Sequence, residues 1–231
     1  MCIIESKQLV KGFGDPPVII LKEISFSVRK GEFLSITGRS GSGKSTLLYT
    51  LSGLDPLSSG EVLIQGENVH SMPGREMHEF RNKKIGFVFQ FHYLLPELSA
   101  IENILMPARK AGEDKMRKKY AIELMNDFEI LKCKDKIPAQ MSGGELQRTS
   151  IARSLIMEPL ILFADEPTGN LDTENGERVM NIFDKVNKNL STTIIMVTHE
   201  PDFAARAMRT IHLVDGKIES DIINSKKKKR N

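Results

Sequence analysis

Residues Phe33–Thr46 read FLSITGRSGSGKST, and this stretch decides the fold. Phe33–Ile36 is a compact apolar run that is typical of a short strand. The segment Gly38–Thr46 then fits the pattern G-x-x-x-x-G-K-[ST], and the run Leu47–Leu51 indicates a helix directly after it. A strand, a glycine-rich loop and a helix in this order predict a phosphate-binding loop in an α/β fold.

The residue types of this loop suit the chemistry of a nucleotide phosphate. Glycines let the backbone curl so that successive N–H groups point into one concavity, and the dipole of the following helix favours an anion there. Lys44 supplies a positive charge for the β- and γ-phosphates, and Ser45 offers a hydroxyl to Mg²⁺. The alternative is a turn that merely contains a lysine, but a chance match arises on the order of once per hundred such chains. The residues predicted to bind the nucleotide are Gly38, Arg39, Ser40, Gly41, Ser42, Gly43, Lys44, Ser45 and Thr46.

Strand patterns surround the loop on both sides. Apolar and polar residues alternate over 24–28, and the first 70 or so residues are predicted to be mostly strands. Continuous apolar runs at 160–164 and 192–197 predict strands that are buried on both faces, as in a parallel sheet. The segments 175–189 and 201–208 are predicted to be helices.

The middle of the chain has a different pattern. Apolar residues fall at helical spacing over 113–131, with charged residues on the remaining face. Pro107 and Gly112 are expected to bound this helical region on one side, and Pro138 on the other. The pattern predicts a helical subdomain of about residues 95–158, inserted into the α/β core.

Polar side chains follow two of the buried strands. Asp165 ends the run 160–164 and is the expected partner of Mg²⁺, while Glu166 can polarise an attacking water as a general base. His199 follows the next strand and is expected to contact the γ-phosphate. The alternatives are an acidic turn at the end of a strand and a histidine that caps the helix beginning at Pro201; the preceding phosphate loop favours the functional interpretation.

Composition narrows the class of protein. The 231 residues are 40% apolar, which supports a globular core, and the net charge is +3. Five positive charges lie at 226–230; without them, 28 basic face 30 acidic side chains, so the body is not a basic nucleic-acid surface. Cys2 and Cys133 exclude a disulfide scaffold, and no apolar run reaches the ~18 residues of a membrane span. We expect one cytosolic domain over 1–225 and a disordered basic tail at 226–231.

A second glycine turn, Met141-Ser142-Gly143-Gly144-Glu145, leads into a predicted helix at 146–156. It predicts a second helix N-terminus able to bind phosphate. A single nucleotide needs only one such site in this form. The economical interpretation is that the second turn serves a nucleotide held by another copy of the chain.

This combination resembles the ATP-binding cassette (ABC) ATPases over residues 3–220. The resemblance implies a P-loop core of ABC type, with an N-terminal antiparallel β-subdomain and an inserted helical subdomain. It makes Glu166 the catalytic glutamate, His199 the switch histidine and Asp172 part of the D-loop. It also implies that Gln90 contacts Mg²⁺ and that Phe13 stacks on adenine, where tyrosine is usual. The signature turn that closes in trans would be Ser142, Gly143, Gly144 and Glu145, with Glu145 in place of glutamine and adding negative charge near a phosphate.

The segment after Gln90 resembles most closely the ATPases of lipoprotein-releasing (Lol) systems of Gram-negative bacteria. In this family, membrane subunits dock there. The expected contact residues are Phe91, His92, Tyr93, Leu94 and Leu95; the alternative is ordinary core packing. The cell-division and macrolide-export branches share much of this pattern and stay open as alternatives.

The resemblance implies a complete scheme. Two copies would sandwich two ATP–Mg²⁺ and hydrolyse them at the cytoplasmic face of the bacterial inner membrane. Two permease subunits of the lipoprotein-releasing type would be the membrane partners, and no nucleic acid would be bound. Competing classes are a cassette protein that acts on DNA or ribosomes, which tends to carry further modules, and an ATP-binding module without turnover, against which intact Glu166 and His199 argue.

Overall fold

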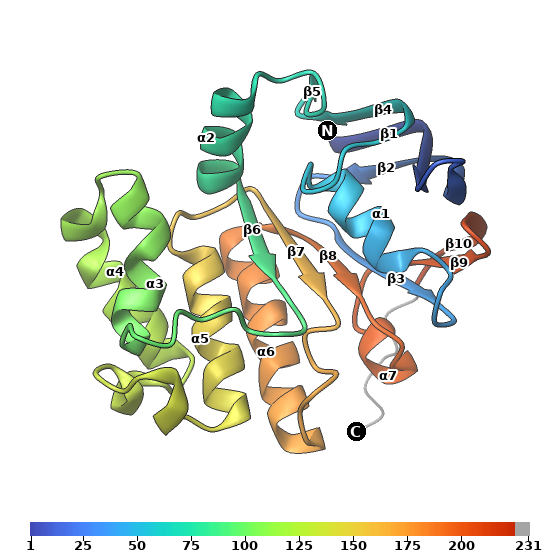
Figure 1. The fold of residues 1–231 in the computed structure, drawn as a ribbon. Helices are drawn as coiled ribbons and strands as arrows, with labels where there is room; N and C mark the ends of the chain where they lie inside the picture. The colour runs from blue at the N-terminus through green and yellow to red at the C-terminus, as the bar shows by residue number, and fades with distance from the viewer. Residues whose placement is uncertain (225–231) are drawn as a thin grey trace.

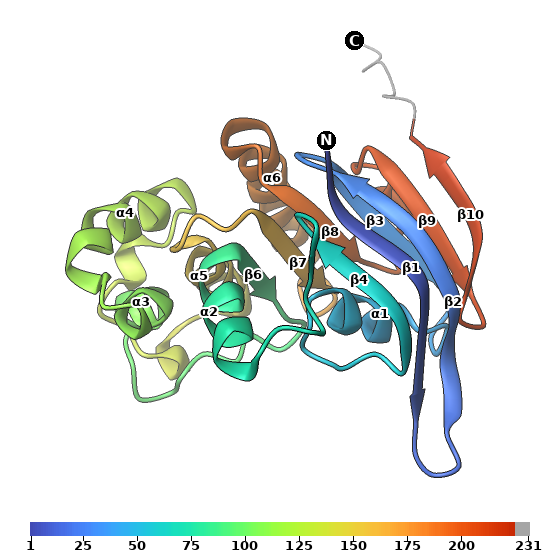
Figure 2. The same ribbon diagram turned by 90° about the horizontal axis from the view of Figure 1, so that it is seen from above.

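The computed structural model describes residues 1–224 and contains two β-sheets and a layer of helices (Figures 1 and 2). The smaller sheet is antiparallel, with strand order β2-β1-β4-β5, and the larger has the order β10-β9-β3-β8-β7-β6. The strands are β1 Cys2–Phe13, β2 Val18–Arg29, β3 Phe33–Gly38, β4 Ser59–Ile64, β5 Glu67–Asn68, β6 Ile85–Val88, β7 Ile161–Asp165, β8 Thr193–Val197, β9 Arg209–Val214 and β10 Lys217–Ile223. This arrangement confirms the predicted α/β class with an N-terminal antiparallel sheet.

The larger sheet is parallel except at its β10 edge. Strand β3 pairs in parallel with β8 and β9, and β7 pairs in parallel with β6 and β8. The carboxyl ends of β3, β7 and β8 therefore lie at one edge of the sheet, where a ligand site is expected in open α/β folds. Asp165 ends β7 at this edge, beside Val197 at the end of β8.

The continuous apolar runs arise because the sheet is covered on both faces. In β7, Ile161 and Phe163 belong to the core that contains helix α1 (Lys44–Leu51) and the small sheet, whereas Leu162 and Ala164 belong to the core beneath the other helices. The same alternation divides the residues of β8 between the two cores. Helix α1 lies between the two sheets, and α5 and α6 cover the opposite face (Figure 1).

The helices of the middle region form a layer beside the sheet (Figure 1). Their bounds are α2 Gly74–Lys84, α3 Ala100–Lys110, α4 Asp114–Asp127 and α5 Gly143–Leu155, with 3₁₀ turns η1 at Leu131–Cys133 and η2 at Pro138–Gln140; the later helices are α6 Thr173–Leu190 and α7 Pro201–Ala204. Pro107 lies inside α3, so the prediction that it bounds the helical region is wrong. Only three residues of α3 follow it, and Asn82 donates a hydrogen bond to its carbonyl, 3.1 Å away.

Two further predictions concern the C-terminal part of the chain. The predicted helix 201–208 ends at Ala204, because the chain then joins the sheet: the backbone N–H of Met208 donates to the Phe33 carbonyl at 2.7 Å. The predicted basic tail, 226–231, lies outside the described residues. Within residues 1–224, none of the helices is both long enough and apolar enough to span a membrane.

Candidate functional site

The loop between β3 and α1 is shaped to leave its N–H groups open. Gly43, at the start of α1, has φ +97°, and a Cβ atom there would lie 2.9 Å from Leu21 Cδ2. In the described part of the chain, residues 1–224, no side chain caps α1, and the first turn of this helix holds no acidic residue. The helix start therefore keeps its unpaired N–H groups and its positive dipole end facing a hollow of about 560 Å³.

The contents of this hollow fit a phosphate group. The Lys44 side chain is almost fully buried, and its Nζ donates to the Arg39 carbonyl at 3.0 Å, so the ammonium group lies over the loop. Within residues 1–224, the buried Ser42 Oγ has no hydrogen-bond partner. This atom does not line the hollow: a Cβ on Gly38 would lie 2.6 Å from it, so it lies behind the loop. The hollow is lined by Phe13, Ile20, Ser40, Gly41, Gly43, Lys44, Ser45, Thr46, Glu166 and His199.

The Asp165 carboxylate is held from both sides. Ser45 Oγ donates to Oδ1 at 2.9 Å, and Tyr49 Oη donates to Oδ2 at 2.7 Å. Burial raises the pKa of Asp165, although both hydrogen bonds favour its ionised form. A hydroxyl and a carboxylate side by side are oxygen ligands of the kind that Mg²⁺ prefers, so the pair fits this cation.

Sequence reasoning missed Tyr49. The signal was available, because Tyr49 lies four residues after Ser45 on α1, and residues at this spacing share one face of a helix. The two hydroxyls therefore reach the same carboxylate.

Glu166 and His199 meet at the opening of the hollow. His199 Nδ1 and Glu166 Oε2 are 3.1 Å apart, and the Glu166 backbone has φ +45°. Gln90 lines no part of the hollow but lies nearby: a Cβ on Gly169 would be 3.4 Å from Glu166 Oε2 and 3.5 Å from Gln90 Nε2. Phe13 lines the hollow and is half-exposed, with Lys11 Nζ 4.4 Å from its ring centroid. The structure thus brings Phe13, Glu166 and His199 to the phosphate loop and leaves Gln90 beside them.

The turn Ser142–Glu145 lies away from this hollow, at the start of α5. Ser142 and Glu145 form a capping box: the Ser142 N–H donates to Glu145 Oε2 at 2.9 Å, and the Glu145 N–H to Ser142 Oγ at 3.4 Å. Lys132 Nζ lies 3.0 Å from Glu145 Oε1. The backbone hydrogen bond from Ser142 lowers the pKa of Glu145 to about 2 despite burial, so the side chain is ionised.

The negative charge expected at Glu145 is present, but it is paired within the chain. One carboxylate oxygen accepts a hydrogen bond from the backbone, and the other is paired with Lys132. The charge is thus largely compensated within the chain, although the capping box also uses two backbone N–H groups of the helix start.

Asp172 begins α6 in a similar way. Its Oδ1 accepts from the Asn175 N–H at 2.8 Å, and its side chain is otherwise exposed. The hydrogen bond from this N–H lowers the pKa of Asp172.

The segment after Gln90 is not core packing. Phe91, Tyr93 and Leu95 are 63%, 65% and 40% exposed, and none of the five residues from 91 to 95 belongs to either buried core. Arg153 of α5 holds the backbone here, donating to the carbonyls of His92 at 2.7 Å and Tyr93 at 2.6 Å.

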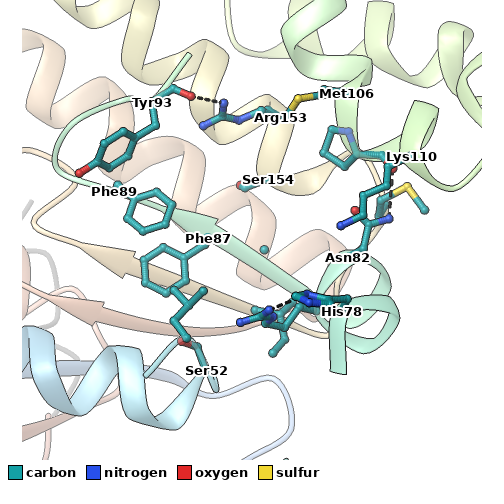
Figure 3. Close-up of a pocket in the computed structure, with 16 residues that line it drawn as sticks. Ser52, His78, Asn82, Phe87, Phe89, Tyr93, Met106, Lys110, Arg153 and Ser154 are labelled. Carbon is teal, nitrogen blue, oxygen red and sulfur yellow. Dashed lines mark hydrogen bonds between the residues drawn. The ribbon is translucent and has the colours of Figure 1, made fainter. Parts of the chain in front are cut away.

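This segment borders a second hollow, of about 450 Å³, between α2, β6, α3 and α5 (Figure 3). One wall is aromatic: the rings of Phe87 and Phe89 stack at 4.2 Å between centroids, and Tyr93 meets Phe89 edge-on at 5.1 Å. The opposite wall carries Lys110 and His78 (Figure 3). The hollow is therefore apolar on one side and carries the positive charge of Lys110 on the other.

Comparisons with known proteins place the chain in a family. Residues 21–169 match the model of the family described as "ABC transporter". The chain is 52% identical over 212 residues to the lipoprotein-releasing system ATP-binding protein LolD of Leptospira interrogans serogroup Icterohaemorrhagiae serovar Lai (strain 56601), which covers 92% of this chain and 89% of that one. It is 48% identical to LolD of Aquifex aeolicus (strain VF5), with 94% of both chains covered.

Solved structures give the same result for the fold. The dimeric structure of MJ0796, a bacterial ABC transporter cassette, superposes with a TM-score of 0.89 at 36% identity, covering 96% of this chain and 99% of that one. A post-hydrolysis dimer of MJ0796 bound to ADP and Pi superposes with a TM-score of 0.87 at 34% identity, with the same coverage.

Proposed function

Because the chain belongs to the ABC transporter family of ATP-hydrolysing cassettes, we propose that it drives the release of lipoproteins from the bacterial inner membrane. The observation that carries this proposal is the hollow where the phosphate loop, Glu166 and His199 meet, in a chain related along most of its length to lipoprotein-releasing ATP-binding proteins. It would act as a peripheral subunit at the cytoplasmic face of that membrane.

The phosphate loop would bind the triphosphate of ATP. Its open N–H groups and Lys44 would face the β- and γ-phosphates, and the exposed face of the Phe13 ring would stack on adenine. Ser45 and Asp165 would hold Mg²⁺, with Gln90 as a further ligand, and the bound cation would offset negative charge on the phosphates. Tyr49 donates to Oδ2 of Asp165 and so orients the carboxylate, with Oδ1 beside Ser45.

Glu166 and His199 would act on the water that attacks the γ-phosphate. Glu166 would accept the proton of this water on a carboxylate oxygen. His199 contacts Oε2 of the same carboxylate through Nδ1, so its ring orients Glu166 and its Nε2 is free to contact the γ-phosphate. The groups that accept the proton and stabilise the charge would then be in position before the reaction, so little reorganisation would be needed.

The site would be completed by a second copy of the chain. Ser142, Gly143 and Gly144 do not line the hollow of their own chain; Ser142 and Gly143 are exposed at the start of α5, and Gly144 is buried behind them. In an antiparallel pair, each copy would present this turn to the γ-phosphate held by the other. The dimeric form of the MJ0796 cassette supports this arrangement.

The exposed residues Phe91–Leu95 and the second hollow would dock permease subunits, two of the lipoprotein-releasing type. An aromatic wall, a cationic wall and exposed apolar side chains favour a partner segment that is amphipathic and carries acidic residues. Substrate would then be handled by the membrane subunits alone.

The test is reconstitution of the chain with its co-purified membrane subunits in proteoliposomes that contain an acylated lipoprotein. Release of the lipoprotein to a soluble fraction should require ATP and stop with Glu166→Gln, while the complex stays assembled. ATP-dependent turnover without any lipoprotein release would contradict the proposed substrate.

A further inference from the structure

Two segments that this chain would present to its twin lie side by side. The turn at the start of α5 and the loop at the start of α6 are distant in sequence, yet a Cβ on Gly143 would lie 4.0 Å from Leu171 Cδ2. The closest approach is at the next residue: a Cβ on Gly144 would lie 2.2 Å from Asn175 Oδ1 and 2.6 Å from Asn175 Cγ. Only glycine lets α5 approach Asn175 this closely.

The Asn175 side chain bonds to both segments at once. Its Oδ1 accepts from the Arg148 guanidinium on α5 at 3.1 Å. Its Nδ2 donates to both carboxylate oxygens of Asp172, at 3.1 Å and 2.9 Å, and its backbone N–H donates to Oδ1 at 2.8 Å. One amide thus joins the helix that carries the signature turn to the residue that caps α6.

The charges around Asn175 fix the direction of its amide. Arg148 is 5% exposed and Asp172 is exposed, so a buried cation lies on one side and a carboxylate on the other. The amide oxygen faces the cation and the amide nitrogen faces the anion, which is the favourable orientation. Within residues 1–224, Arg148 Nε has no hydrogen-bond partner, so the contact with Asn175 is important for this buried guanidinium.

We propose that Asn175 is a positioning residue that fixes the signature turn and the D-loop of one chain relative to each other, so that both reach the twin's nucleotide together. This inference rests on the proposed function, because it assumes a site shared between two copies. Asn175 lies outside the hollow of its own chain, so its loss should leave the first encounter with ATP intact and weaken closure of the pair.

The experiment uses the full chain with Glu166→Gln, which slows hydrolysis and so preserves the ATP-bound pair. Two quantities are measured: the Kd of a fluorescent ATP analogue with Mg²⁺ at low protein concentration, and the ATP concentration that gives half-maximal dimerisation, by light scattering after size exclusion. Asn175→Ala should raise the second about tenfold and change the first by less than about twofold. Asn181→Ala, on the same helix but bonded to Arg206, is the matched control and should change neither.

Asn175→Asp tests the bridge itself. It preserves the shape and the acceptor for Arg148 but puts a second carboxylate against Asp172, so dimerisation should be at least as weak as with Asn175→Ala. Dimerisation as strong as in the parent chain, with either substitution, would overturn the inference. So would an equal loss of ATP binding and dimerisation, which indicates a merely structural role.

Ser142→Ala separates this inference from the proposed function. If Ser142→Ala weakens dimerisation and Asn175→Ala does not, the shared site stands and the positioning role fails. If Ser142→Ala has no effect on ATP-driven dimerisation, the shared site itself fails, and the role of Asn175 fails with it.

Discussion

The starts of α1 and α5 are the two glycine turns of this chain, and they differ in how their backbone N–H groups are used. Helix α1 begins at Gly43 with no side-chain cap and no acidic residue in its first turn. Helix α5 begins at Ser142 with a full capping box, and Glu145 lies in its first turn. The two turns look alike in sequence, and both were predicted to bind phosphate.

The difference suggests that the two helix starts would bind phosphate in different ways. An uncapped helix start binds an anion through its own N–H groups and dipole, so α1 is suited to hold ATP in a single chain. At α5, two N–H groups are already bonded within the chain, and a carboxylate lies close to the turn. The proposed contact between α5 and a phosphate would therefore depend on the Ser142 hydroxyl, the remaining N–H groups and the compensation of Glu145 by Lys132.

The largest expected effect comes from a substitution at the uncapped start of α1. Lys44→Ala removes the buried ammonium over the loop and should raise the Kd for ATP–Mg²⁺ roughly a hundredfold, because a charge-assisted contact to phosphate is lost. Equilibrium binding of a fluorescent ATP analogue measures the change, with the exposed Lys22→Ala as the matched control. Similar affinities for the two variants would show that α1 is not the principal anion site.

The next largest effect comes from a substitution beside the capped start of α5. Lys132→Met leaves Glu145 uncompensated, so the ATPase rate of the assembled transporter should fall about fivefold to tenfold at saturating ATP. In a Glu145→Gln chain no charge needs compensation, and the same lysine change should cost less than about twofold. An equal loss in both backgrounds would mean that Lys132 acts through the fold and not through the carboxylate.

A smaller effect concerns the Mg²⁺ site proposed beside α1. Tyr49→Phe removes one hydroxyl from Asp165 and keeps the ring against Phe87, 5.7 Å away between centroids. The Mg²⁺ concentration for half-maximal ATP binding should rise about threefold, because Asp165 is less firmly oriented. The Kd for ATP without Mg²⁺ should not change. A rise in both quantities would indicate a general disturbance of the loop.

The smallest effect is on stability. The pKa of Glu145 lies near 2 in the folded chain, below the ordinary value of 4.5, so its stabilising contribution is complete above pH 4.5 and is lost as the pH falls toward 2. With Lys132 mostly exposed, the contribution should be about 1–2 kcal/mol. Urea unfolding at pH 7 and pH 3 should therefore show a smaller acid-induced loss for Glu145→Gln than for the parent chain. Equal losses would contradict the low pKa.

Much of the fold could be predicted because its signals are local. The phosphate loop and the runs at 160–164 and 192–197 follow from residue type and spacing, and the structure places them as predicted. Pro107 was misjudged because a proline near the end of a helix costs only one backbone bond. The segment 201–208 was misjudged because Met208, just before β9, already donates a backbone hydrogen bond to Phe33 of β3.

Site residues that belong to one sequence motif could be predicted, whereas residues that act through tertiary contacts could not. Tyr49 and Asn175 belong to no motif, and their importance comes from partners on other elements, Asp165 and Arg148. The pairing of Lys132 with Glu145 joins residues thirteen positions apart and needs the 3₁₀ turn η1 to bring them together. Such contacts are fixed by packing, which sequence spacing does not reveal.

Helix α5 has a further consequence. It carries the signature turn at its first residues and Arg153, which holds the His92 and Tyr93 carbonyls, near its last. At 1.5 Å per residue, this makes α5 a stiff rod of about 15 Å between the two points. If α5 moves as a rigid body, a displacement of the turn at its start also moves Arg153 and the two carbonyls that it holds. ATP-driven movement of the turn at the start of α5 would then be passed to the segment after Gln90 through this one helix, and the length of the helix would set the distance between the two points.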